Sequence, residues 1–172
     1  RRSSDLIIAC NFTRETPRTT LPFREVETLF HEMGHALHHL LTKIDISMFA
    51  GIHHVEWDAV ELPSQMMENF TWDYETIKML TSYNPHGDDH MPKDLYDKMV
   101  AARHFGAASS LIGNIKYALI DLNIFSNTEA VVSEVEEQVS NAVMLREYDA
   151  LRKIAPTFSH IFDGGYTAGY YS

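Results

Sequence analysis

The sequence predicts a mainly α protein with one short strand near its N-terminus. Apolar side chains recur at helical spacing through three long stretches, whereas residues 6–12 form a short apolar run that is typical of a strand. We find no apolar run long enough to cross a membrane, no internal repeat and no low-complexity tract. A chain of 172 residues ordinarily forms one modest domain with a single core.

Charge and cysteine content limit the class of partner and the compartment. The formal net charge of −10 argues against nucleic acid as a partner, because phosphate binding needs a basic surface. Cys10 is the single cysteine, so an internal disulfide is impossible and a reducing compartment is the natural one. We expect a cytoplasmic protein without a membrane partner, with an organelle matrix as the alternative.

The first element is the strand over residues 6–12. One strand cannot make a sheet, so we expect it to pair across a small ribbon or with strands outside this sequence. An edge strand of this kind commonly binds extended peptide, and a plain structural strand is the equally favoured alternative. The residues that follow, up to Leu21, lack periodicity and predict a loop.

The second element is a helix over about residues 23–42, which Pro22 is suited to start. It contains His31, Glu32 and His35 in the arrangement H-E-x-x-H. Imidazoles four positions apart lie on one helix face and reach a single ion, and Glu32 lies about 100° around the same turn. Glu32 can then accept a proton from a water at the fourth position of a tetrahedral zinc site. An ordinary core helix that carries this pattern by chance is the alternative.

A catalytic zinc of this class needs a third protein ligand. The third element, a helix predicted over about residues 55–80, begins with a stretch dense in carboxylates. Glu61 and Glu68 are seven positions apart and project from nearly the same face. We take Glu61 as the third ligand and expect Glu68 or Asp58 to hold a ligating imidazole. A solvated helix charge is the alternative for both, and the favoured one for Asp58.

Four more histidines accompany these segments: His38, His39, His53 and His54. Adjacent residues rarely converge on an ion that already has three ligands, so we expect His53 and His54 in a loop along a substrate channel. Hydrogen-bonded structural histidines are the favoured interpretation of His38 and His39.

A helical bundle is predicted over about residues 92–154, where Pro92 opens the first helix. Its apolar stripes comprise Leu95, Met99, Ala102, Phe105, Leu111, Ile115, Leu119, Leu122, Val131, Val135, Val139 and Val143. We expect Glu134, Glu136 and Glu137 on the solvated face, with an acidic channel wall that selects cationic peptides as the alternative.

The last element is a glycine- and tyrosine-rich loop over about residues 156–172. Gly164 and Gly165 permit backbone geometries closed to other residues, so such a loop can move. His160, Tyr166 and Tyr170 carry donors of the kind that bind a peptide carbonyl and the oxyanion formed from it. Packing or surface exposure is the more common role of such residues on composition alone.

Three motifs in order carry a family resemblance: H-E-M-G-H-A-L-H-H, then G-I-H-H-V-E-W-D-A-V-E-L-P-S-Q-M-M-E-N-F, then H-I-F-D-G-G-Y-T-A-G-Y-Y. They resemble the oligopeptidase A, thimet oligopeptidase and peptidyl-dipeptidase family, most closely its bacterial-type oligopeptidase A branch, along nearly the whole chain. The resemblance implies a zincin-like helical catalytic subdomain that acts on short peptides. It also implies one Zn²⁺ held by His31, His35 and Glu61, with Glu32 as the general base.

The same resemblance assigns the last segment to the active site. It implies that His160 and Tyr166 stabilise the reaction intermediate and that Tyr170 and the loop glycines, Gly164 and Gly165, bind substrate. The family pattern continues with a further tyrosine directly after Ser172, which this sequence lacks.

Family members are several times longer and consist of two helical halves that enclose a deep channel. We therefore expect this chain to be an excerpt of a single catalytic domain whose remainder is missing, and the absence of an initiator methionine agrees with that. Two other functions stay open: a noncatalytic peptide-binding module with a vestigial zinc site, and a zinc hydrolase of another substrate class.

Overall fold

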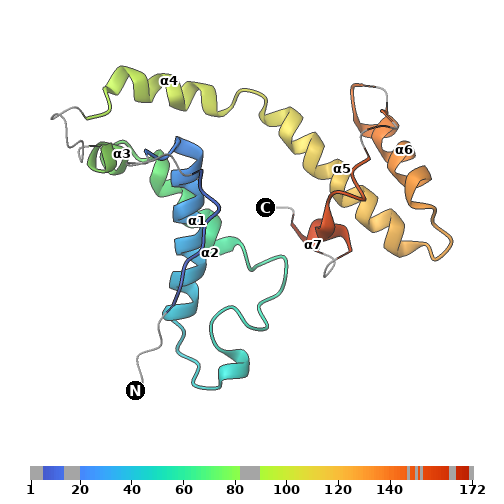
Figure 1. Cartoon of the computed structure of the whole chain (residues 1–172), viewed down its shortest axis with the longest axis horizontal. Helices are drawn as coiled ribbons and strands as arrows, with labels where there is room; N and C mark the ends of the chain where they lie inside the picture. The colour runs from blue at the N-terminus through green and yellow to red at the C-terminus, as the bar shows by residue number, and fades with distance from the viewer. Residues whose placement is uncertain are drawn as a thin grey trace. The chain divides into compact units, whose positions relative to one another are not determined.

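The structure, a computed structural model, describes residues 6–13, 20–81, 90–146, 148–149, 151, 153–162 and 166–170. These residues form helices, turns and irregular segments, so the predicted helical class is confirmed. The chain divides into two compact units, Arg1–Ala102 and Arg103–Ser172, and each is described by itself (Figure 1).

The strand predicted over residues 6–12 is wrong. These residues have no regular secondary structure, and none of the described residues forms a strand. A strand is stabilised by backbone hydrogen bonds to a neighbouring strand. Because the described chain supplies no such neighbour, the apolar run remains irregular.

The first unit is organised around α1 (Phe23–Leu40), which packs against the shorter α2 (Leu62–Glu68) and η2 (Asn69–Trp72). It also contains η1 (Ser47–Phe49), α3 (Tyr74–Thr81) and most of α4 (Lys93–Arg103). The indole Nε1 of Trp72 donates a hydrogen bond of 2.7 Å to Glu27 Oε1, and its ring meets Phe23 edge-on at 4.6 Å. These contacts join the beginning of α1 to η2.

The segment predicted as one helix over residues 55–80 comprises a turn over 57–61 followed by α2, η2 and α3. Pro63 lies at the start of α2, where its missing N–H costs no helical hydrogen bond. Asp73 separates η2 from α3 with an extended backbone. Its Oδ2 accepts hydrogen bonds from the backbone N–H and the hydroxyl of Thr76, at 2.9 and 3.0 Å, and these bonds lower the pKa of Asp73.

The second unit packs α5 (Ala107–Ser126) against α6 (Val132–Val143) and α7 (Tyr166–Gly169), with η3 (Ser159–Ile161) between α6 and α7 in the sequence. Its core consists of Ile120, Val139 and Ile161, around which Leu119, Ile124, Val135, Val143 and Phe158 are partly buried. Residues of the predicted bundle and of the final segment therefore share one core.

One prediction about the acidic residues of α6 is wrong. Glu134 and Glu137 are exposed as expected, but the side chain of Glu136 is buried, with 1% of its surface accessible. Glu136 lies one helical turn before Val139 and Ser140, which are also buried, so it occupies the core-facing side of the helix.

Large apolar side chains remain exposed in both units. The exposed fraction is 71% for Leu41 and 70% for Leu62 in the first unit, and 59% for Leu111 and 61% for Phe125 in the second. Within the described ranges, no helix has the length and apolarity required to cross a membrane.

Candidate functional site

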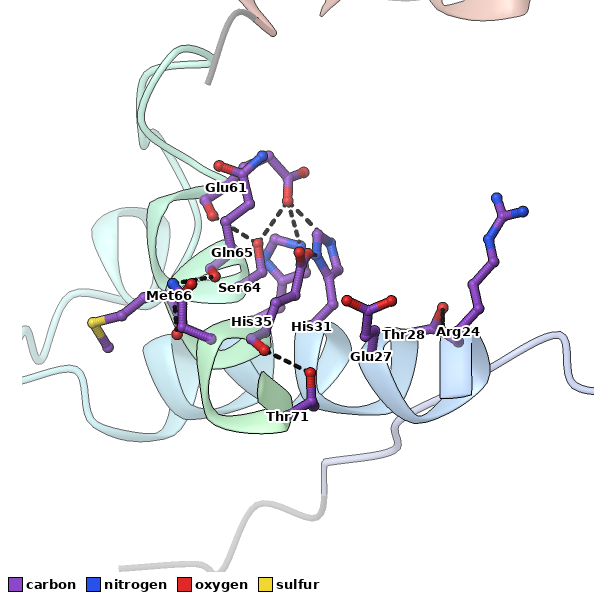
Figure 2. Close-up of polar contacts among 12 residues, drawn as sticks. Arg24, Glu27, Thr28, His31, His35, Glu61, Ser64, Gln65, Met66 and Thr71 are labelled. Atoms are coloured by element: carbon purple, nitrogen blue, oxygen red, sulfur yellow. Dashed lines mark hydrogen bonds and ion pairs between the residues drawn. The ribbon is translucent and has the colours of Figure 1, made fainter. Parts of the chain in front are cut away.

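Two imidazoles and a carboxylate meet where α1 passes the start of α2. His31 and His35 lie one turn apart on α1, and Glu61 lies directly before α2. The Nε2 atoms of both histidines are 3.1 Å from the same oxygen, Glu61 Oε2, and the two rings meet edge-on at 5.0 Å. Figure 2 shows both rings directed at this carboxylate. The structure thus brings together all three residues predicted as metal ligands.

The donor set suits a zinc ion. One ligand atom from each residue can be chosen so that all three atoms lie within 4.8 Å of one another. Two imidazole nitrogens and one carboxylate oxygen are one of the protein donor sets that hold a catalytic zinc, which keeps its fourth position open. The side chains of His31, His35 and Glu61 are 20%, 22% and 13% exposed, so all three are partly buried.

Glu68 supports the same group from the end of α2. Its Oε1 lies 2.6 Å from Nδ1 of His31, the ring nitrogen opposite the one that faces Glu61. A carboxylate in this position fixes the tautomer of a ligating imidazole and leaves its Nε2 free of a proton for a metal. Asp58, the other outer carboxylate considered, lies exposed in the turn before α2.

Glu32 lies beside His31 on α1 and faces the irregular N-terminal segment. A cavity of about 260 Å³ is lined by Glu32, His35 and residues 6–9, together with His39 and His53. The same carboxylate lines a second hollow together with Cys10. Burial raises the pKa of the Cys10 thiol, and the negative charge of Glu32 raises it further. Glu32 therefore lines one cavity together with His35 of the histidine pair and the irregular N-terminal segment.

The predicted donors of the final segment gather in the second unit. His160, Tyr166 and Tyr170 line a cavity of about 290 Å³. The rings of His160 and Tyr166 are 5.7 Å apart and those of Tyr166 and Tyr170 are 5.5 Å apart, both edge-on. Gly164 and Gly165, predicted to contact substrate, lie outside the described residues.

Sequence analysis missed other residues of this cavity. Asn114 and Tyr117 of α5 also line it, and the Tyr117 ring lies 4.9 Å from Phe158. Asn114 and Tyr117 are three positions apart and therefore lie on one face of α5. This spacing indicates a shared cavity only once the last segment is known to pack against that face.

Two buried carboxylates hold the chain around this cavity. Asp121, 3% exposed, accepts a hydrogen bond of 2.7 Å from the backbone N–H of Ala168 in α7. Glu136 accepts the backbone N–H groups of Ile154 and Ala155, at 2.6 and 3.3 Å. Hydrogen bonds to a carboxylate are stronger than those to neutral acceptors, so these residues fix the backbone on both sides of His160.

Three of the four histidines at positions 38, 39, 53 and 54 line a different, mainly apolar cavity of about 650 Å³. His38, His53 and His54 line it. His39 lies against His53, with ring centres 6.1 Å apart. Both His53 and His54 are exposed in the turn after η1, and His54 has a left-handed backbone with φ of 60°. Within the described ranges, the one grouping of ligand type is His31, His35 and Glu61.

Comparison with known proteins identifies the family of the chain. The whole chain, residues 1–172, matches the model of peptidase family M3, so the chain belongs to this family of zinc peptidases. The family resemblance seen in the sequence is therefore confirmed.

Several of the similar proteins are oligopeptidases A. The protein from Escherichia coli is 39% identical over 171 residues, which are 96% of this chain and 25% of that protein. The probable cytosolic oligopeptidase A of Arabidopsis thaliana is 42% identical over 156 residues, 88% of this chain and 22% of the relative. The organellar enzyme of the same plant, named chloroplastic/mitochondrial, is 42% identical over 158 residues, 88% of this chain and 20% of the relative. The chain spans about a quarter of the length of these relatives or less.

Proposed function

We propose that this chain is the metal-binding part of a zinc-dependent oligopeptidase that hydrolyses peptide bonds in short peptides. The observation that carries the proposal is the convergence of His31, His35 and Glu61, in which two Nε2 atoms lie 3.1 Å from one carboxylate oxygen. Membership in peptidase family M3 supports the reaction class.

In this proposal His31, His35 and Glu61 would hold one Zn²⁺, which would supply a Lewis acid able to lower the pKa of a water molecule. Glu32 takes the proton from the attacking water and returns it to the leaving amine. No covalent intermediate with the protein is needed. The cavity that Glu32 lines together with His35 and residues 6–9 supports this role.

We assign the donors of the second unit to the substrate. His160 and Tyr166 donate hydrogen bonds to the carbonyl oxygen as it becomes negative, whereas Tyr170 and the two glycines, Gly164 and Gly165, bind the peptide. The shared cavity of His160, Tyr166 and Tyr170 supports the assignment.

We further propose that the remainder of a larger catalytic domain covers much of this chain. The exposed apolar side chains of α1, α2 and α5 and the limited share of each relative that the chain spans support this. In the same proposal the substrate is a peptide rather than nucleic acid, and the compartment is the cytoplasm or an organelle matrix.

The decisive experiment separates metal binding from chemistry. Glu32→Gln in the full-length protein should keep one zinc per chain while turnover of a short quenched peptide falls by roughly 10²–10⁴-fold, the usual contribution of a general base. Glu61→Ala should instead lose zinc. Glu56→Gln, a change at the exposed position directly before the turn over 57–61, is the matched control for both measurements.

Each alternative has its own result. Retained turnover in Glu32→Gln would remove Glu32 as the base, and an unchanged zinc content in Glu61→Ala would move the third ligand to Glu68 or another carboxylate. A parent protein that binds zinc but cleaves no peptide would be a peptide-binding module or a hydrolase of another substrate class.

A further inference from the structure

The backbones of α1 and α2 touch at Gly34, inside the H-E-x-x-H motif. A Cβ atom placed on Gly34 would lie 2.4 Å from Ser64 Cα and 2.6 Å from the carbonyl oxygen of Pro63. Both neighbours are backbone atoms, which cannot rotate away as a side chain does. Any residue larger than glycine at position 34 would therefore push the start of α2 away from α1, and with it Glu61, which directly precedes that helix.

Ser64 lies at this contact and reaches the carboxylate of Glu61. Its side chain is completely buried, and its Oγ is 2.7 Å from Glu61 Oε2 and 2.8 Å from the backbone carbonyl oxygen of Glu61. Glu61 Oε2 is the same oxygen that faces both histidines (Figure 2). A hydroxyl that occupies one lone-pair direction of this oxygen restricts the rotation of the carboxylate and leaves another direction toward His31 and His35.

We propose that Gly34 and Ser64 are positioning residues for the third zinc ligand, Glu61. Gly34 sets the distance between α1 and α2, and the Ser64 hydroxyl sets the orientation of the carboxylate. The inference deepens the proposed function and rests on it, because it concerns residues that bind no metal and touch no substrate.

Thr71, in the same unit, shows what a buried hydroxyl with a purely structural role looks like, and Ser64 can be compared with it. Thr71 is also completely buried, and its hydroxyl also bonds a carbonyl three positions back, that of Glu68, at 2.7 Å. Serine and threonine commonly make such local bonds for helix geometry alone. Ser64 differs from Thr71 in that its hydroxyl also lies within hydrogen-bond distance of a ligand oxygen.

The experiment compares two pairs of variants in the full-length protein. Ser64→Ala is matched with Thr71→Val, since each removes one buried hydroxyl. Gly34→Ala is matched with Gly113→Ala, because a Cβ on Gly113 in α5 meets no atom within 4 Å. The readouts are the zinc Kd from chelator competition, the visible spectrum of the cobalt(II)-substituted protein, and thermal unfolding of the metal-free protein.

We expect Ser64→Ala to weaken zinc binding by roughly 10–100-fold, as is usual when a group that orients a ligand is removed. Its cobalt(II) spectrum should change, because that spectrum reports the number and geometry of ligands. Thr71→Val should leave both readouts unchanged even if it lowers the unfolding temperature. Gly34→Ala should weaken zinc binding at least as strongly as Ser64→Ala, whereas Gly113→Ala should have no effect on it.

Two results would overturn the inference. One is a Ser64→Ala protein with the parental zinc Kd and cobalt(II) spectrum, and the other is an equal loss of affinity in Thr71→Val. If the parent itself does not bind stoichiometric zinc, the proposed function fails with it. A zinc-binding parent with an unaffected Ser64→Ala variant rejects the positioning role alone.

Discussion

Replacement of Glu136 by glutamine should loosen the backbone that leads to His160. The Glu136 carboxylate is 1% exposed, and it accepts the N–H of Ile154 at 2.6 Å through Oε1 and the N–H of Ala155 at 3.3 Å through Oε2. These two bonds cross from α6 to the segment before η3. Glutamine has nearly the same shape, so the change removes an acceptor without opening a cavity.

The size of the effect follows from the number of acceptors lost. A glutamine keeps one oxygen, so one of the two N–H groups then faces an NH₂ donor, and an unsatisfied buried donor costs about 1–3 kcal/mol. Because 1.4 kcal/mol corresponds to a factor of ten in an equilibrium constant, the equilibrium population of the locally open state should rise by roughly 5–150-fold. Glu136→Ala leaves both N–H groups without a partner and should cost about twice as much.

Amide hydrogen exchange measures this effect locally. In Glu136→Gln, the amides of Ile154 and Ala155 should exchange faster by the factor given above, whereas amides in α1 should be unaffected. Glu137→Gln, at the neighbouring exposed position, is the control. Unchanged exchange at both amides would mean that the two hydrogen bonds do not stabilise this segment, and the reasoning would fail.

Two other predictions concern carboxylates of the first unit. Glu68→Ala should weaken zinc binding by roughly 10–100-fold in chelator competition, because His31 Nδ1 loses its partner at 2.6 Å, while Glu75→Ala at an exposed position should not. The hydrogen bonds from Thr76 depress the pKa of Asp73 below its ordinary value of 3.8, so their contribution to stability is complete above that pH and is lost as the pH falls through the depressed pKa. Asp73→Asn should remove this part of the acid dependence in urea unfolding curves measured at different pH, and an identical dependence in the variant would contradict the assignment.

Local spacing made the candidate metal ligands of α1 predictable. Residues four positions apart lie on one face of any helix, so His31 and His35 needed only the prediction of a helix, which the structure contains as Phe23–Leu40. Glu61 was harder to predict, because local sequence spacing does not determine which carboxylate of a later segment lies next to His31 and His35. Its choice depended on chemistry, the need for a third ligand, and on the family resemblance.

The burial of Glu136 shows where pattern analysis failed. Its spacing from Val132, Val139 and Val143 places it on the apolar side of α6, so the signal was present in the sequence. A charged residue on that side is normally assigned to solvent, because burial of a charge is costly unless it is paired or hydrogen-bonded. The compensating partners are backbone N–H groups far along the chain, which no periodicity reveals.

The strand predicted over residues 6–12 failed for a related reason. A helix closes its hydrogen bonds within one segment, whereas a strand depends on a second segment, and the described chain offers none. The same apolar residues, Leu6, Ile7 and Ile8, instead line the cavity that contains Glu32. The apolar run therefore lies beside Glu32, but pairing with another strand would have been needed to make it a strand.

The H-E-x-x-H motif has physical requirements beyond its ligands and base. In this chain one of its variable positions is Gly34, and the space for a Cβ there is already filled by the backbone at Ser64 and Pro63. The glycine therefore allows the Glu61 carboxylate to approach His31 and His35, with its Oε2 3.1 Å from both Nε2 atoms. A chain with the same motif but a larger residue at this position could keep the two histidines aligned and still lack the third ligand. For that reason we propose that the contact between α1 and α2, as well as the spacing of the histidines, determines whether the motif in this chain binds a metal.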